Sequence, residues 1–302
     1  MKVGFVGLGI MGLPMSKNIL KAGHELVTVD RENASARTKA AVEEVKALGA
    51  ETVKTPAELA EKVDVIITML PNSPQVRQVC LGEGGIVETG SEDTVVIDMS
   101  SIDPVESKAI AAELAKKGID MLDCPVSGGE PKAIDGTLSV MCGGKKETWD
   151  KYYDLLMTMA GSVVYVGEIG SGNIAKLANQ MIVATNIGIV AEALTFAKKA
   201  GADPELVYQA IRGGLAGSTV MDAKAPMMLA GNYNPGFRID LHIKDMNNVL
   251  NAAHAINMPV PLAAHMMEVM QELKLHGEGG CDHDDIVRYY ERMTGVSIVK
   301  EK

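Results

Sequence analysis

The stretch that most constrains the fold is Gly7-Leu8-Gly9-Ile10-Met11-Gly12, a G-x-G-x-x-G pattern near the N-terminus. An apolar strand pattern over residues 3–7 leads into it, and a helical pattern from about Met11 to Lys21 follows. A second strand pattern, Leu26 to Val29, ends at Asp30. A strand, a glycine turn, a helix, a second strand and an acid in this order indicate a βαβ unit that binds a dinucleotide.

The spacing of the three glycines has a physical explanation. Gly7 permits the tight turn, Gly9 lets a pyrophosphate approach the backbone, and Gly12 lets the helix pack closely on the strand. The N-terminus of the helix then offers N–H groups to the phosphates. Asp30 is placed to accept hydrogen bonds from the adenosine ribose and to repel a 2′-phosphate, which favours NAD over NADP. Arg31 acts in the opposite sense, because an arginine there can hold that phosphate, so NADP stays open.

Alternating patterns continue to about residue 165 and predict an α/β, Rossmann-type, doubly wound sheet. Leu70, Pro71 and Asn72 end one strand pattern, and Ser100 and Ser101 follow the next, so these residues meet at the carboxyl edge where ligands bind. For the serines, helix capping before residue 104 is the alternative. The predicted helices cover 34–47, 56–62, 104–117 and 147–160; the predicted strands cover 64–70, 94–97, 119–123, 137–142 and 163–166, the last two as edge strands.

The segment after the strand at 119–123 has the composition of an anion site. Ser127 is followed by Gly128 and Gly129, and such a turn leaves backbone N–H groups and one hydroxyl directed at an anion. A substrate carboxylate is the natural occupant, and an ordinary glycine turn is the alternative.

From Gly170 onward strand patterns disappear. We therefore expect two domains, a Rossmann-type NAD-binding domain at 1–165 and an all-helical substrate and oligomerisation domain at 166–302. The long helix within residues 170–201 is rich in Ala and Gly, which favours close packing against neighbours or another subunit, so a homo-oligomer, dimer or tetramer, is expected. The predicted helices cover 172–200, 204–212, 219–230, 240–256, 260–275 and 283–293.

The long helix carries no charge between Lys176 and Glu192, but its polar side chains argue against a membrane span. Lys176, Asn179 and Val183 share one face of this helix. An ammonium beside an amide in a buried helix is costly without a partner, so these residues form a candidate site. Extension of Lys176 into solvent is the alternative.

The charge of the chain excludes several classes of function. A net charge of −10 over 302 residues leaves no basic surface for nucleic acid or an anionic membrane. The four cysteines show no C-x-x-C spacing, which predicts neither a zinc site nor a disulfide framework and favours a reducing compartment. The glycine-rich N-terminus lacks a cleavage motif for secretion, so we expect a cytoplasmic protein.

Three further features of the sequence can be explained by ordinary structural roles as well as by a function. Lys244-Asp245 is an acid–base pair on a predicted helix, either a solvated face or a lysine that folds over the cofactor. His242 alone is more often a packed or exposed histidine than a catalytic one. The acidic run 281–285 looks metal-like, but acids before a helix are what its positive N-terminus favours, and we predict no metal.

Four motifs occur together in the order found in one family. These are G-L-G-I-M-G at 7–12, D-C-P-V-S-G-G at 123–129, G-x-G-x-x-x-K-x-x-N at 170–179 and K-D at 244–245. With them the whole chain resembles the β-hydroxyacid dehydrogenase family, which includes 3-hydroxyisobutyrate dehydrogenase and, more distantly, 6-phosphogluconate dehydrogenase. The stretches 125–141, 211–228 and 235–246 most resemble the tartronate semialdehyde reductases of this family.

The resemblance implies roles for particular residues. Lys176 becomes the general acid–base, Asn179 a substrate-binding neighbour, and Ser127, Gly128 and Gly129 the carboxylate cradle. The cofactor would be lined by Leu70, Pro71, Asn72 and Ser101, with Lys244 close to it. The chain departs from the family at Gln180, where relatives commonly have a second asparagine, and at Ser101, where many have threonine.

The implied reaction is the NADH-dependent reduction of tartronate semialdehyde to D-glycerate. An alkoxide that forms on hydride addition needs a proton, which an ammonium such as that of Lys176 can donate. Desolvation would lower the pKa of this lysine, so that it also serves as a base in the reverse direction. The carboxylate anchor would then face the helix of Lys176 across an interdomain cleft. Rival interpretations are 3-hydroxyisobutyrate dehydrogenase, a dehydrogenase for a hydroxymethyl diacid, an imine reductase, or a dinucleotide sensor without catalysis.

Overall fold

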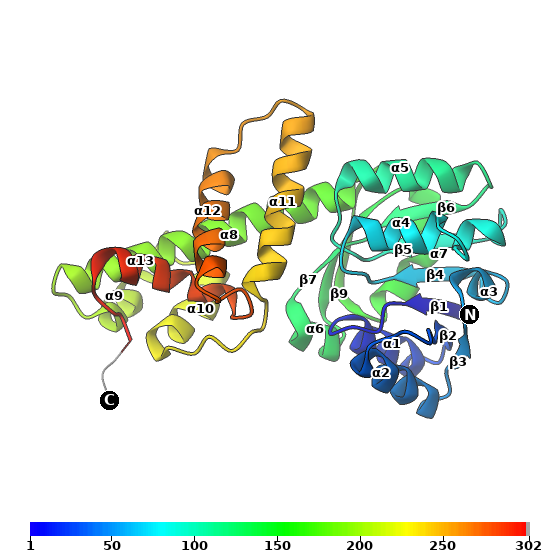
Figure 1. Cartoon of the computed structure of the whole chain (residues 1–302), viewed down its shortest axis with the longest axis horizontal. Helices are drawn as coiled ribbons and strands as arrows, with labels where there is room; N and C mark the ends of the chain where they lie inside the picture. The colour runs from blue at the N-terminus through cyan, green and yellow to red at the C-terminus, as the bar shows by residue number, and fades with distance from the viewer. Residues whose placement is uncertain (300–302) are drawn as a thin grey trace. The chain divides into compact units, whose positions relative to one another are not determined.

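The computed structural model describes residues 1–299 and divides into two compact units, Met1–Lys176 and Leu177–Lys302. The predicted boundary lies earlier, between residues 165 and 166. The difference arises because the first turns of the long helix are bound to the first unit by hydrogen bonds from Gly170 and Asn173 to Asp123. Figure 1 shows the course of the chain.

The first unit is built on a mixed sheet with strand order β3-β2-β1-β4-β5-β6-β8-β7 and with β9 paired to β8. The strands from β3 to β6 are parallel, as expected for a Rossmann-type fold. Its strands are β1 (Lys2–Val6), β2 (Glu25–Val29), β3 (Glu51–Val53), β4 (Val65–Thr68), β5 (Val95–Asp98), β6 (Asp120–Asp123), β7 (Val126–Ser127), β8 (Leu138–Gly143) and β9 (Ala160–Gly167).

Both faces of this sheet are buried, which explains its continuous apolar strands. Val65 and Ile67 of β4 enter one hydrophobic core, whereas Ile66 between them enters the other. Helices cover both faces: α1 packs on α2 and α6, and α4 packs on α5 (Figure 1). The helices of this unit are α1 (Gly12–Lys21), α2 (Ala36–Ala47), α3 (Pro56–Ala60), α4 (Ser73–Leu81), α5 (Pro104–Ala115), α6 (Gly129–Asp135) and α7 (Lys146–Met157), with a 3₁₀ turn η1 (Ile86–Glu88).

The structure corrects the sequence prediction at two places in this unit. The segment 137–142 is not an edge strand, because β8 pairs with β6 and β7 on one side and with β9 on the other. The glycine turn after residue 124 is also more regular than expected, because Val126 and Ser127 form the short strand β7 and α6 begins at Gly129. The elements β3, α4 and α6 were not predicted at all.

The second unit is helical, as predicted. The long helix α8 (Ser171–Lys199) enters it from the first unit, and residues such as Leu177, Ile187 and Leu194 pack in the core of the second unit. Its other helices are α9 (Pro204–Ile211), α10 (Thr219–Ala230), α11 (Ile239–Ala255), α12 (Pro261–Leu275) and α13 (Val287–Thr294), with a 3₁₀ turn η2 (His283–Ile286). The fold is therefore a Rossmann-type α/β domain followed by a helical domain.

Among the described residues, α8 is long and apolar enough to cross a membrane by length and composition, with a mean hydropathy of 1.4 in its most apolar window. The sequence analysis expected the polar residues of α8 to make it too polar for a membrane span. By the criterion of length and composition that expectation was wrong. Half of that window is buried in the protein, and buried core helices pass the same test. Its packing makes α8 a core helix.

Candidate active site

The G-x-G-x-x-G turn has the backbone geometry that dinucleotide binding requires. Gly7 has φ +109°, and a Cβ there would collide with the carbonyl oxygen of Met69. A Cβ on Gly12 would collide with the carbonyl oxygen of Gly7, which is the close packing expected of the third glycine. A Cβ on Gly9 would meet nothing within 4 Å, so open space lies over this residue. The turn therefore fits a dinucleotide pyrophosphate at Gly9.

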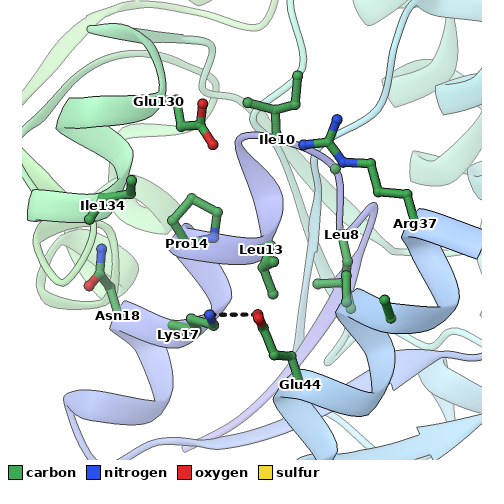
Figure 2. Close-up of a pocket in the computed structure, with 13 residues that line it drawn as sticks. Leu8, Ile10, Leu13, Pro14, Lys17, Asn18, Arg37, Glu44, Glu130 and Ile134 are labelled. Carbon is green, nitrogen blue, oxygen red and sulfur yellow. Dashed lines mark ion pairs between the residues drawn. The ribbon is translucent and has the colours of Figure 1, made fainter.

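A hollow of about 460 Å³ extends from this turn between α1, α2 and α6. Figure 2 shows Ile10 with the guanidinium of Arg37 near it at one end, and an ion pair between Lys17 and Glu44 at the other. Of the predicted cofactor residues, only Leu8, Gly9 and Ile10 line this hollow.

Asp30, the acid that the sequence predicts to bind the ribose, lies directly after the second strand of the sheet. Asp30 follows β2, and its backbone N–H donates to the carbonyl oxygen of Val53 at 2.8 Å. Its carboxylate is 3.5 Å from the Lys54 ammonium, and its side chain is 29% exposed. Arg31 next to it is exposed. The carboxylate is accessible to a ribose, but a cation already accompanies it.

The ends of β4 and β5 come together as predicted. The Leu70 N–H donates to the hydroxyl of Ser100 at 2.9 Å, and the Leu70 side chain lies next to Gly7. Ser100 is completely buried, so it is a structural link rather than a ligand-facing group. The alternative of helix capping by the serines was wrong, because Asp103 caps α5. Ser101 is partly exposed, Pro71 is exposed, and Asn72 occupies the N-cap position of α4.

The proposed carboxylate cradle lies at the start of α6. Ser127 is partly exposed and pairs with Ser139 of β8. Gly128 and Gly129 have φ values of +139° and +69°, which side chains rarely tolerate, and Gly128 is the N-cap of α6. The backbone conformation therefore requires glycine at both positions. Glycine turns of this kind can direct successive backbone N–H groups outward, towards an anion.

The start of α8, the helix that carries Lys176, is held by contacts that the sequence alone did not reveal. Asp123 accepts hydrogen bonds from the N–H groups of Gly170 and Asn173, both at 2.7 Å, and so caps the first turn of α8. Burial raises the pKa of Asp123 to about 7. The two hydrogen bonds act in the opposite direction, because they favour the ionised form. The Asn173 amide accepts from the N–H of Ile102 at 3.0 Å and donates to the Ser107 hydroxyl at 3.1 Å.

Lys176 lies one turn after Asn173 and is 6% exposed. The alternative that it extends into solvent was therefore wrong. Gly172 permits this arrangement, because a Cβ there would collide with backbone oxygens of Asp123 and Met141. Asp123 and Asn173 were missed because their partners are distant in sequence, although Asp123 is part of the motif at 123–129.

In the second unit a buried polar network joins two predicted site residues. Asn179 donates to Gln180 at 2.9 Å, and Gln180 donates to Asp245 at 2.6 Å. Asp245 pairs with Lys244 at 2.7 Å and is 1% exposed, so this acid–base pair is not a solvated face. The sequence analysis singled out Gln180 and Asp245, but it did not predict that the two side chains are hydrogen-bonded to each other.

The histidine and the acidic run have structural partners. His242 is fully buried, and its Nε2 lies 3.3 Å from the carbonyl oxygen of Gln180. Asp282 caps η2, pairs with Lys224 at 2.6 Å and accepts from the N–H groups of Gly236 and Phe237. These contacts account for Asp282 as part of the core, and Asp285 forms an ion pair with Arg288 at 3.0 Å.

Both units match models of known domains. Residues 2–167 match the NAD binding domain of 6-phosphogluconate dehydrogenase, and residues 170–290 match the NAD-binding domain of NADP-dependent 3-hydroxyisobutyrate dehydrogenase. The 2-hydroxy-3-oxopropionate reductase of Escherichia coli (strain K12) is 40% identical over 299 residues, which cover 99% of this chain and 100% of the relative.

Two other similarities extend over nearly the whole chain. The 2-(hydroxymethyl)glutarate dehydrogenase of Eubacterium barkeri is 34% identical over 98% of this chain and 97% of its own. The structure of the Mycobacterium tuberculosis 3-hydroxyisobutyrate dehydrogenase with L-serine has a TM-score of 0.86 at 29% identity, covering 95% of this chain and 98% of the other.

The Rossmann-type domain, its glycine turn and these relatives define an NAD(P)-dependent oxidoreductase that acts on CH–OH groups of small hydroxyacids. Within that class the chain belongs to the 3-hydroxyisobutyrate dehydrogenase-related family of β-hydroxyacid dehydrogenases.

Proposed function

We propose that this enzyme reduces tartronate semialdehyde (2-hydroxy-3-oxopropanoate) to D-glycerate with NADH, and that Lys176 is the general acid. The observation that carries the proposal is the burial of Lys176, 6% exposed, on a helix whose start is hydrogen-bonded to Asp123 and, through Asn173, to Ile102. The 40% identity to a 2-hydroxy-3-oxopropionate reductase over the whole chain supports the substrate.

The chain supplies binding and proton transfer. The reduced nicotinamide, when bound, is the source of the hydride. Lys176 donates a proton to the developing alkoxide and stabilises its charge, which is worth most where water is excluded. The hydroxyl of Ser127 and the N–H groups at Gly128 and Gly129 bind the substrate carboxylate. Asn179 hydrogen-bonds the substrate.

Replacement of Lys176 tests the mechanism. Lys176→Ala should lower kcat by roughly 10²–10⁴-fold, the usual contribution of general acid catalysis. Lys198→Ala, on the exposed part of the same helix, serves as the control and should retain wild-type kcat. A Lys176→Ala enzyme with wild-type kcat would remove Lys176 from the mechanism.

The substrate is tested against the rivals that the relatives suggest. Purified enzyme should be assayed in the oxidative direction with D-glycerate, with 3-hydroxyisobutyrate, with 2-(hydroxymethyl)glutarate and with L-serine, each with NAD and with NADP in the oxidised form. The proposal expects the highest kcat/KM for D-glycerate, the product of tartronate semialdehyde reduction. A higher kcat/KM for another acid would reassign the enzyme to that substrate.

The cofactor preference rests on Asp30. Its accessible carboxylate accepts ribose hydroxyls and repels a 2′-phosphate, although Lys54 at 3.5 Å and the neighbouring Arg31 reduce that repulsion. Asp30→Ala should therefore shift the ratio of kcat/KM values for NADH and NADPH towards NADPH. An unchanged ratio would show that Asp30 does not select the cofactor.

We also propose that the enzyme is a cytoplasmic homo-oligomer, a dimer or tetramer. Ile182, Ile189 and Phe196 recur every seven residues on α8 and are 62%, 55% and 73% exposed. Such a stripe is typical of a helix that packs against a second copy. Ile189→Gln should lower the mass measured by light scattering at micromolar concentration, whereas a monomeric wild-type enzyme would contradict the proposal.

A further inference from the structure

Gln180 is the residue through which several polar groups of the second unit are connected. It lies on α8, is 4% exposed, and uses both ends of its side-chain amide. Its Oε1 accepts from Asn179 Nδ2 at 2.9 Å, and its Nε2 donates to Asp245 Oδ2 at 2.6 Å. A buried amide with both ends hydrogen-bonded has one preferred orientation.

The orientation of this amide follows from the chemistry of Asp245. An ionised carboxylate only accepts hydrogen bonds, so the NH₂ group of Gln180 must face it. The carbonyl oxygen of Gln180 then remains for Asn179, whose NH₂ group donates to it. With this one N–H bound to Gln180, the Oδ1 and the second N–H of Asn179 are the groups with which Asn179 can bind a ligand. This is the arrangement needed to bind a substrate hydroxyl group.

The same chain of contacts fixes Lys244. The other carboxylate oxygen of Asp245, Oδ1, lies 2.7 Å from the Lys244 ammonium. Asp245 is 1% exposed, and a buried carboxylate is costly unless it is paired or hydrogen-bonded. Gln180 supplies one of these partners, and Lys244 is the other.

The main chain at Gln180 is also held from α11. His242 Nε2 lies 3.3 Å from the Gln180 carbonyl oxygen, and its Nδ1 lies 3.1 Å from Nδ1 of His283. A neutral His242 that donates from Nε2 has its lone pair on Nδ1, so His283 donates to it. The imidazole pair thus adds a second attachment between α8 and α11.

We propose that Gln180 is a positioning residue of this enzyme, which orients Asn179 for the substrate and, through Asp245, orients Lys244 for the cofactor. The proposal rests on the roles given to Asn179 and Lys244 under the proposed function and deepens them. The proposal explains why this chain has glutamine at position 180, where relatives commonly have asparagine. The longer glutamine side chain reaches Asp245 on α11.

A double-mutant cycle tests the substrate side of this proposal. Gln180→Leu keeps the volume but removes both hydrogen bonds, and should raise KM for the aldehyde acid roughly 3- to 10-fold at saturating NADH. Asn179→Ala should raise KM as well. If Gln180 acts through Asn179, the double variant has the KM of Asn179→Ala alone. If the KM of the double variant instead rises by the product of the two single effects, the proposal is overturned.

The single variant Asn179→Ala separates this proposal from the proposed function. An unchanged KM in Asn179→Ala would refute the substrate role of Asn179 and, with it, the substrate side of the positioning proposal. Loss of turnover in Lys176→Ala together with additive effects at residues 179 and 180 would refute only the positioning role.

Gln180→Glu tests the cofactor side. A glutamate still accepts the hydrogen bond from Asn179, but it places a carboxylate against Asp245 and loses the donor. The Kd for NADH, measured by fluorescence titration, should rise severalfold while KM for the aldehyde acid stays near the wild-type value.

Thr195→Val is the matched control, because Thr195 is similarly buried on α8 and its hydroxyl donates within the helix, to the carbonyl oxygen of Ala191. It should leave both constants unchanged. Equal changes of Kd and KM in Gln180→Glu, or the same changes in Thr195→Val, would show a general packing effect and overturn the proposal.

Discussion

Replacement of Asp123 by asparagine should change how the stability of the enzyme depends on pH. Asp123 is completely buried, and its two carboxylate oxygens accept the N–H groups that begin α8. Burial raises the pKa of this carboxyl group from 3.8 to about 7, which means that burial outweighs the hydrogen bonds. The variant keeps one acceptor oxygen but has no proton to lose.

The sign and size of the effect follow from linkage. Because the pKa is raised in the folded state, the stability that protonated Asp123 contributes is fully present below pH 3.8 and is lost as the pH rises through about 7. Between pH 5 and pH 8 the wild-type enzyme should lose roughly 3 kcal/mol of stability through this group. Asp123→Asn lacks this loss, so its stability relative to wild type should rise by that amount.

Urea unfolding followed by circular dichroism at several pH values between 5 and 8 would measure the difference. Asp154→Asn, an exposed aspartate on α7, is the control and should follow the wild-type curve at every pH. A difference between Asp123→Asn and wild type that is constant with pH would refute the reasoning. A difference that grows in favour of wild type as the pH rises would show that the hydrogen bonds from α8 outweigh burial.

Three further variants test other parts of the structure. Gly9→Ala should weaken NADH binding in a fluorescence titration without lowering Tm, because its Cβ enters open space. Gly12→Ala should lower Tm, because its Cβ collides with the Gly7 carbonyl oxygen. Equal losses of Tm in the two variants would contradict this assignment. Lys224→Met should cost about 3–5 kcal/mol in urea unfolding at pH 7, because the buried Asp282 then loses its nearest cation and keeps only the His283 ring at 3.8 Å. A loss below about 1 kcal/mol would mean that the N–H groups of Gly236 and Phe237 suffice for Asp282. Burial raises the pKa of Asp284 to about 8, so the stability from its protonated form is present below pH 3.8 and lost as the pH rises through about 8. Asp284→Asn should therefore gain Tm relative to wild type between pH 5 and pH 9, and a relative loss over this range would be inconsistent with that pKa.

Most helices and parallel strands could be predicted because their signals are local. The turn at 7–12, the apolar run of β4 and the helical pattern of α8 each depend on residues within a few turns of one another. The strand β8 was placed wrongly at an edge because pairing with β9 is a property of two distant segments. The short helix α4 begins at Ser73-Pro74, directly after residues that the sequence indicated only as a loop.

The sequence by itself determined the Rossmann-type and helical halves, the glycine turn, and the place of Lys176 on the long helix. Only the tertiary structure decided which groups hold that helix: Asp123 caps its start, and Gln180 meets Asp245 on α11. The physical reason is that periodicity and turn chemistry act over short stretches, whereas a buried polar group takes its partner from whichever strand or helix packs beside it. Here those partners lie 47 and 65 residues away along the chain.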